Sequence, residues 1–250
     1  MKKSLSYVLS PVFFLAWLVF LNFFHILQVI AFRYVGERAH RRTVDALNAC
    51  LLHSLWLLGT RFRVEFSEPL PQPLSRPIIF VANHQNKLDV VGISWYLRHF
   101  SPKFVSKREL SRGIPSVSYN LRHSGAALIN RDDAKQAITE IGRLGQLIEA
   151  TNTSAVIFPE GTRSTTGEMK AFNAAGIKQL LKKSPSALVI PIYIHQTWAL
   201  NRFGKYPMSV GEQISWTVLP AIDPQGKNIT EVAVLVEESI RRAYEVKRGT

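Results

Sequence analysis

A charge-free stretch near the N-terminus limits what this chain can fold into. No Asp, Glu, Lys or Arg occurs between Lys3 and Arg33. A helix that crosses a bilayer needs roughly 20 mostly apolar residues, and the uninterrupted apolar part, residues 11–21, is shorter than that. The polar residues that follow recur every three positions, at Asn22, His25 and Gln28. A helix places them along one side, so we predict a membrane-inserted helix whose second half lies in the interface. A single tilted span is the alternative, and a cleaved signal peptide is disfavoured because no small-residue cleavage site follows.

Basic residues flank this stretch and dominate the whole chain. Arg33, Arg38, Arg41 and Arg42 follow it directly, which predicts a cytoplasmic location for that flank and affinity for anionic headgroups. With 31 Lys and Arg against 18 Asp and Glu, the net charge is +13. This excess predicts a polyanionic partner: nucleic acid, an anionic membrane surface or an acidic substrate. The apolar stretch favours the membrane and argues against nucleic acid. A single cysteine, Cys50, excludes an internal disulfide.

The remaining hydrophobic pattern predicts strands that alternate with helices. A helix over 43–58 would pack on the first helix as a hairpin or dock on the body, and a linker with three prolines spans 67–76. Strands are expected over 78–81, 104–106, 126–130, 155–158, 188–194 (interrupted at Pro191) and 214–219, and helices over 87–100, 132–149, 173–183 and 230–246. This alternation predicts an α/β fold with a mixed, largely parallel sheet flanked by helices. We expect two domains, N-terminal membrane-associated helices over 1–62 and a catalytic domain over 63–250.

The first candidate site follows the first of these strands. His84 stands just past it, and Asp89 comes five residues later at the start of a helix. Ligands of open α/β sheets bind at the carboxyl ends of the strands. Asp89 can accept a hydrogen bond from one imidazole nitrogen and leave the other as a base. The simpler interpretation is a surface histidine beside a helix-capping aspartate. Backbone amides near His84 are candidate donors to an oxyanion.

Candidate binding residues follow two more of the predicted strands. Glu160, Gly161, Thr162 and Arg163 follow the strand over 155–158, and Arg131 follows the strand over 126–130. Glycine lets the backbone approach a ligand closely, and the arginines offer planar forks for a phosphate or carboxylate. An ordinary polar turn and a surface arginine are the simpler interpretations. Lys103, Lys107, Arg108, Arg112 and Arg122 add a basic stretch between these blocks that could meet coenzyme A, an acidic carrier protein or anionic lipid.

In this order the blocks resemble the glycerolipid acyltransferase family. The resemblance rests on Asn-His-x4-Asp at His84 and Asp89, on Gly125 and Arg131, on the complete Phe-Pro-Glu-Gly-Thr-Arg-Ser over 158–164, and on an apolar strand centred on Pro191. It covers roughly residues 77–219. Asn173 stands where the family often has a lysine. This difference leaves the identity of the acceptor open, whereas the expected reaction is unchanged.

The resemblance implies acyl transfer from acyl-CoA or acyl carrier protein to the sn-2 hydroxyl of lysophosphatidic acid, giving phosphatidic acid. His84 would be the base and Asp89 its orienting partner, while Arg131, Glu160, Gly161, Thr162 and Arg163 would bind the substrate. Neither a cofactor nor a metal is expected. The alternatives are another lysophospholipid or aminolipid acceptor, and a catalytically silent membrane lipid-binding protein. A lipid hydrolase lacks support because no Gly-x-Ser-x-Gly elbow occurs.

Overall fold

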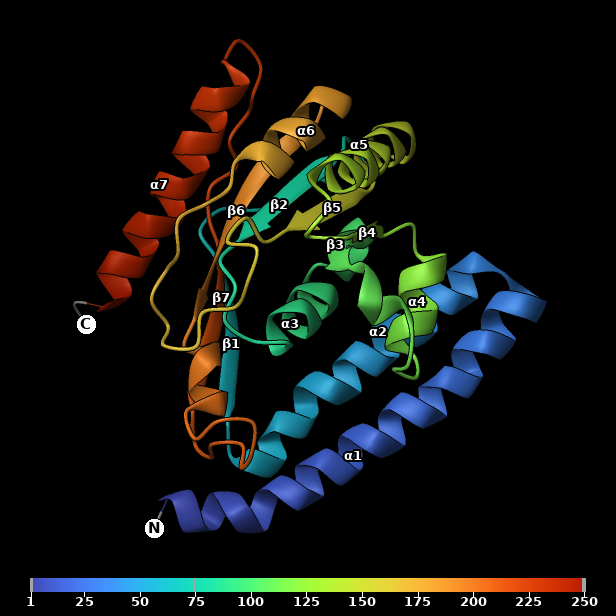
Figure 1. Cartoon of the computed structure of the whole chain (residues 1–250), viewed down its shortest axis with the longest axis vertical. Coiled ribbons are helices and arrows are strands. Elements are labelled where there is room, and N and C mark those ends of the chain that lie inside the picture. Colours follow the sequence, from blue (N-terminus) through green and yellow to red (C-terminus); the bar gives the residue numbers. More distant parts are fainter. Residues whose placement is uncertain (1, 74, 249–250) are drawn as a thin grey trace.

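The computed structural model describes residues 2–73 and 75–248. Leu74 of the predicted linker and the outermost ends of both predicted domains lie outside the described residues. The described part is one sheet between two layers of helices (Figure 1). This arrangement confirms the predicted α/β fold.

Seven strands form the sheet in the order β1-β7-β6-β2-β5-β3-β4. Their bounds are β1 Arg61–Phe66, β2 Ile78–Ala82, β3 Pro102–Lys107, β4 Ala127–Ile129, β5 Ser154–Ile157, β6 Leu188–His195 and β7 Gln213–Val218. Five of the six pairings are parallel, and only β6 and β7 run antiparallel. The sheet is therefore mixed and largely parallel, as predicted.

The α-helices of the described chain are α1 Lys2–Ile30, α2 Glu37–His53, α3 Leu88–Tyr96, α4 Val117–His123, α5 Ala134–Thr151, α6 Ala175–Lys183 and α7 Ile229–Arg248. Alternate residues of the central strands serve opposite faces. Ile78 and Phe80 of β2 pack with α1, α2 and α3 in one core. Ile79 and Val81 pack with α5, α6 and α7 in the other.

Several predicted boundaries change. The second helix begins at Glu37, six residues before the predicted start at residue 43, so Arg38, Arg41 and Arg42 belong to it. It contacts both α1 and α3, so it forms a hairpin and also docks on the body. Strand β1 and helix α4 were not predicted. The predicted domain boundary after residue 62 falls inside β1, and the division into two domains stays a prediction.

The predicted break at Pro191 is wrong. Strand β6 continues through it, from Leu188 to His195. The carbonyl of Pro191 accepts a hydrogen bond from the N–H of Leu219, which lies one residue past the end of β7. Proline lacks a backbone N–H. In a strand this N–H would point to the same side as the Pro191 carbonyl, toward the segment after β7, so few hydrogen bonds between strands are lost.

Helix α1 lies along the body rather than away from it. At one end Lys2 forms an ion pair with Glu212, 2.7 Å between Nζ and Oε1. Near the other end the Ser116 hydroxyl donates to the carbonyl of Leu21. Gln28 is fully buried and Asn22 is exposed, so the three predicted polar residues do not share one environment. Residues 2–35 form the one stretch of the described chain that is long and apolar enough to cross a membrane, by length and composition.

Candidate active site

The turn after β2 holds a bonded histidine–aspartate pair. The Nδ1 atom of His84 lies 2.8 Å from Oδ2 of Asp89. Because an ionised carboxylate only accepts, we assign the proton to Nδ1, which leaves the lone pair of Nε2 free to act as a base. The side chain of His84 is 14% exposed and that of Asp89 is fully buried. The imidazole also stacks on Phe158, with ring centroids 4.2 Å apart.

Asp89 is held by three further donors. The backbone N–H groups of Gln85 and Asn86 donate to Oδ2 at 2.6 and 2.7 Å. The hydroxyl of Thr197, which follows β6, donates to Oδ1 at 2.6 Å. Together with His84, these donors satisfy the hydrogen-bonding capacity of a carboxylate that is shielded from water. They also show that the amides of Gln85 and Asn86 are engaged, so these two are not free to bind an oxyanion as the sequence suggested.

Glu160 joins the two turns. Its Oε1 accepts from the backbone N–H of His84 at 2.9 Å, and its Oε2 accepts from that of Lys170 at 3.2 Å. Burial raises the pKa of Glu160, and these backbone hydrogen bonds oppose the rise. In return the N–H of Ser164 donates to the carbonyl of His84 at 2.8 Å. Glu160 therefore orders the turn after β2, a role that the sequence did not suggest; its part in substrate binding stays a prediction.

Local hydrogen bonds order the predicted binding turn, residues 160–163. Gly161 has φ of +69°, a left-handed conformation that glycine adopts without strain. The ammonium of Lys170 donates to the hydroxyl of Thr162 at 2.7 Å and to the carbonyl of Arg163 at 3.0 Å. Lys170 was not predicted as a site residue. Its signal in the sequence is weak because it lies in a loop, seven residues after Arg163.

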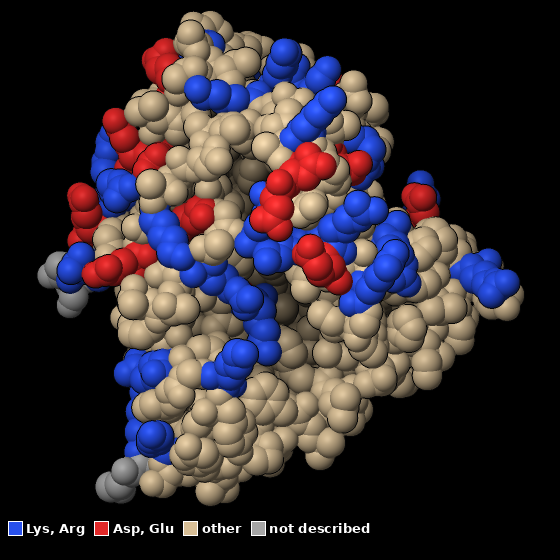
Figure 2. Space-filling model, in the orientation of Figure 1, with Lys and Arg blue, Asp and Glu red and all other residues tan. Residues whose placement is uncertain are grey.

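Positive charge gathers beside this turn. Partial burial, and then the charge of Arg163, lower the pKa of Arg131, so these two guanidinium groups lie close enough to interact. Desolvation and Arg163 likewise lower the pKa of Lys87. The ammonium of Lys87 lies 4.7 Å from the ring centre of Trp17 on α1. Figure 2 shows Lys and Arg side chains as a band across the middle of this face, beside a hollow, with fewer Asp and Glu among them.

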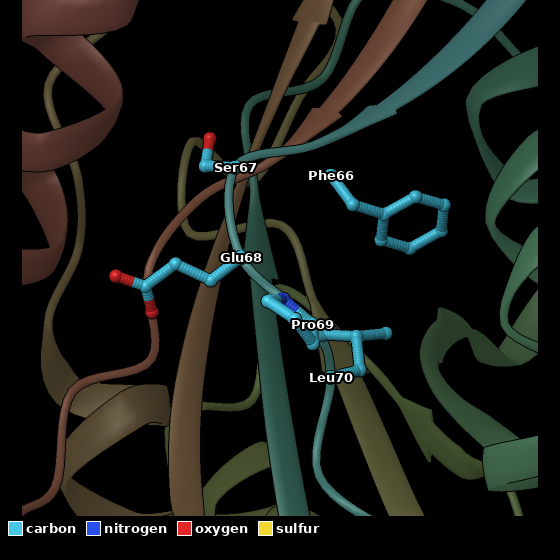
Figure 3. A pocket seen from close by; sticks show the side chains of 5 residues that line it. All are labelled: Phe66, Ser67, Glu68, Pro69 and Leu70. Atoms are coloured by element: carbon cyan, nitrogen blue, oxygen red, sulfur yellow. The ribbon is translucent and has the colours of Figure 1, made fainter.

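The ends of β2, β4, β5 and β6 thus bring together a base, its buried carboxylate and a group of cations. This constellation suits removal of a proton from a hydroxyl on an anionic substrate. A separate cavity of about 420 Å³ lies in the segment after β1 (Figure 3). Phe66, Ser67, Glu68, Pro69 and Leu70 line it. It includes none of the predicted site residues, and we assign it no role.

In comparisons with known proteins, the family model, the relatives and the solved structure that match this chain are all acyltransferases. Residues 61–195 match the sequence model of a family described as Acyltransferase. A 1-acyl-sn-glycerol-3-phosphate acyltransferase of Chlamydomonas reinhardtii is 27% identical over 239 residues, covering 93% of this chain and 68% of the relative. The human enzyme 1-acyl-sn-glycerol-3-phosphate acyltransferase alpha is 24% identical, covering 94% and 79%. The crystal structure of the 1-acyl-sn-glycerophosphate acyltransferase PlsC from Thermotoga maritima has the same fold, with a TM-score of 0.81 at 23% identity over 100% of this chain and 99% of that one.

Proposed function

This chain belongs to the acyltransferase family, and we propose that it transfers a fatty acyl group to the sn-2 hydroxyl of lysophosphatidic acid, giving phosphatidic acid. The donor would be a thioester of the fatty acid, either with coenzyme A or with acyl carrier protein. The named relatives act on this acceptor class. The observation that carries the proposal is the His84–Asp89 pair, 2.8 Å apart, beside the charges of Arg131 and Arg163.

The proposed mechanism needs no enzyme nucleophile. Nε2 of His84 removes the proton of the acceptor hydroxyl as its oxygen attacks the thioester carbonyl. Asp89 stabilises the imidazolium that forms. When the tetrahedral intermediate collapses, the carbon–sulfur bond breaks and the departing thiolate takes the proton from His84. Arg131 and Arg163 hold the phosphate of the acceptor by charge-assisted hydrogen bonds, and the turn with Gly161 and Thr162 keeps Arg163 in place.

We also propose that α1 lies in one leaflet on the cytoplasmic face. Its inner side is tied to the body, and its outer side carries exposed apolar residues at helical spacing: Leu5, Val8, Val12, Leu15, Val19, Phe23, Ile26 and Ile30. A helix with this distribution lies in the plane of the interface. The arginines that follow it would meet anionic headgroups, and a substrate lipid would then reach the site without leaving the membrane.

The test of the reaction is release of free coenzyme A from a long-chain acyl-CoA, with and without lysophosphatidic acid. We expect release that needs the acceptor and falls by about 10²- to 10⁴-fold in His84→Ala, since a general base contributes that much. His99→Ala is the matched control, because His99 is exposed on the turn after α3. Release without the acceptor would indicate a thioesterase. No release from acyl-CoA or acyl carrier protein would favour another acceptor or a silent lipid-binding protein.

A further inference from the structure

A basic cavity lies at the open edge of the sheet, beside β4. Its volume is about 510 Å³, within the range of roughly 300–1,000 Å³ common for small-molecule sites. Three arginines from three separate elements line it, namely Arg108 from the turn after β3, Arg122 from α4 and Arg143 from α5. In Figure 2 the band of basic residues continues over the region where Figure 1 places β4 and α4.

The charges of this cavity are not balanced. Arg143 is paired with Glu140, 3.0 Å between Nε and Oε2, and also donates to the carbonyl of Ala126. Arg122 donates to the carbonyl of Ser111, which is neutral. The guanidinium of Arg108 has no hydrogen bond or ion pair to any residue in the described part of the chain. Two of the three guanidinium groups therefore lack a carboxylate partner, and such forks suit a phosphate.

Glu109, which follows Arg108 in the chain, forms no ion pair with these arginines among the described residues. Its charge partly opposes the lowering of the pKa of Arg131. Side chains of α5 also occupy this edge of the sheet: Arg143 donates to the carbonyl of Ala126, just before β4, and the amide of Gln136 donates to the carbonyl of Leu128. The cavity is thus a place for a small anion rather than for an added strand.

The position of the cavity relates it to the reaction. In the order β2-β5-β3-β4, the strand that His84 follows lies three strand spacings from β4, or about 14 Å across the sheet. Arg108 is nearer, because it directly follows β3, two spacings from β2. A pantetheine arm joins a thioester sulfur to a phosphate through roughly thirteen bonds, which is about 15 Å when extended on the scale of a polypeptide backbone. A pantetheine arm whose thioester lies at His84 is therefore long enough to span the two strand spacings toward Arg108.

We propose that the cavity of Arg108, Arg122 and Arg143 binds the phosphate at the end of the donor's pantetheine arm. This assignment rests on the proposed acyl transfer, and it separates two phosphate sites. The acceptor phosphate lies at Arg131 and Arg163, and the donor phosphate lies beside β4. Coenzyme A and acyl carrier protein both carry this group, so the experiment distinguishes the two sources.

The kinetic test compares donors with and without the phosphate. Arg108→Gln, Arg122→Gln and the double variant are assayed in detergent micelles with long-chain acyl-CoA, acyl carrier protein and acyl-pantetheine. We expect the KM for the phosphate-bearing donor that the wild type uses to rise about tenfold per arginine, as for loss of one charge-assisted hydrogen bond. The kcat at saturating donor, the KM for acyl-pantetheine and the KM for lysophosphatidic acid should not change. Arg143 is left intact because its bonds hold β4.

Arg242→Gln is the matched control, since Arg242 lies exposed on α7 and forms an ion pair with Glu238 on the same helix. An unchanged KM for the phosphate-bearing donor would overturn the assignment. So would an equal rise with acyl-pantetheine, or a rise in the KM for lysophosphatidic acid instead.

A binding measurement keeps this proposal separate from the proposed function. Calorimetry with coenzyme A, and with holo- against apo-carrier protein, requires no turnover. Weaker binding of coenzyme A or of holo-carrier by the double variant supports the site even if lysophosphatidic acid proves not to be the acceptor, and it identifies the source. Equal binding by wild type and variant, or no binding by the wild type, overturns it.

Discussion

At the scale of single residues, Asp89 connects the turn after β2 to the rest of the sheet. Its two oxygens accept from the His84 ring, from two backbone N–H groups and from Thr197, and none of its surface reaches solvent. The carboxylate therefore fixes the tautomer of the base and the shape of the turn at the same time. Both roles require an acceptor-only group.

Asp89→Asn should damage activity and stability together. The amide NH₂ would face a donor, so a buried N–H loses its partner at a cost of about 1–3 kcal/mol. The tautomer of His84 is also no longer fixed, so we expect kcat to fall by about 10²-fold or more. Steady-state kinetics and urea unfolding measure the two effects. A kcat within twofold of wild type would contradict the orienting role.

The pairing of His84 with Asp89 and the place of the turn over 160–163 could be predicted because these residues are local motifs placed directly after buried strands. Thr197 could not, because it reaches Asp89 across 108 positions of sequence. The same holds for the role of Glu160, whose bond to His84 spans 76 positions. Their partners depend on which strands become neighbours, and β2 lies between β5 and β6 only in the folded sheet.

At the scale of elements, the hairpin of α1 and α2 contains a buried histidine. His40 is 4% exposed, and its Nε2 has no hydrogen-bond partner within the described chain. Burial and then His123 lower the pKa of His40 below its ordinary value of 6.5, and Glu37 opposes them. The rings of Phe32 and Tyr119 lie beside it, at 5.5 and 5.7 Å. This surrounding favours the neutral form.

Acid should therefore loosen the hairpin. Because the folded pKa is depressed, the unfolded chain takes up the proton first as the pH falls through about 6.5, so stability present above that pH is lost below it. Between pH 7.5 and 5.5 we expect His40→Phe to lose less free energy of unfolding than the wild type. The exposed His99→Phe serves as the control. Identical pH slopes for wild type and His40→Phe would refute this origin.

Helix α1 also touches the turn after β2. The ammonium of Lys87 lies over the rings of Trp17 and Phe14, at 4.7 and 5.6 Å from their centres. Lys87→Ala should lower the free energy of unfolding by about 0.5–2 kcal/mol, as for a lost cation–π contact. Lys87→Arg should retain most of it, and Lys135→Ala on the exposed side of α5 should have no effect. Chemical denaturation compares the three. Equal losses for the Ala and Arg variants would exclude the ring contact as the cause.

The buried strands were predictable because β2 is apolar at every position and β5 is apolar from Ala155 to Ile157. Strand β1 was missed because its sequence, RFRVEF, alternates charged and apolar residues at the edge of the sheet. Helix α4 was missed because seven residues give too few turns for a periodic signal. Propensity and pattern thus located the centre of the sheet better than its edges.

At the scale of the whole molecule, the exposed face of α1 should decide membrane attachment. Leu15 and Val19 are 60% and 54% exposed on that face. The double variant Leu15→Glu/Val19→Glu should bind anionic vesicles more than tenfold more weakly, because it removes apolar area from the leaflet. Flotation with phosphatidylglycerol vesicles measures this. Val234→Glu, at a similarly exposed site on α7, should bind as the wild type does.

The orientation of α1 has its own test. A Ser4→Cys probe in a Cys50→Ser background is offered an impermeant maleimide on the side of sealed vesicles that holds the catalytic domain. If α1 lies in one leaflet, the probe is labelled from that side, as is a Lys205→Cys control. Labelling of Ser4→Cys only from the opposite side would show that α1 spans the bilayer.

The pairing of β1 with β7 has a consequence for synthesis on the ribosome. Strand β1 is an edge strand whose neighbour, β7, ends at Val218, so this edge of the sheet cannot form until most of the chain has emerged. The segment that bonds to the start of α1, at Met208 and Glu212, emerges equally late. The start of the apolar helix therefore leaves the ribosome long before the segment that it bonds to exists, although α2 follows directly and covers part of its inner face. The exposed apolar side needs a cover meanwhile, so we expect the nascent chain to reach the membrane before the sheet is complete.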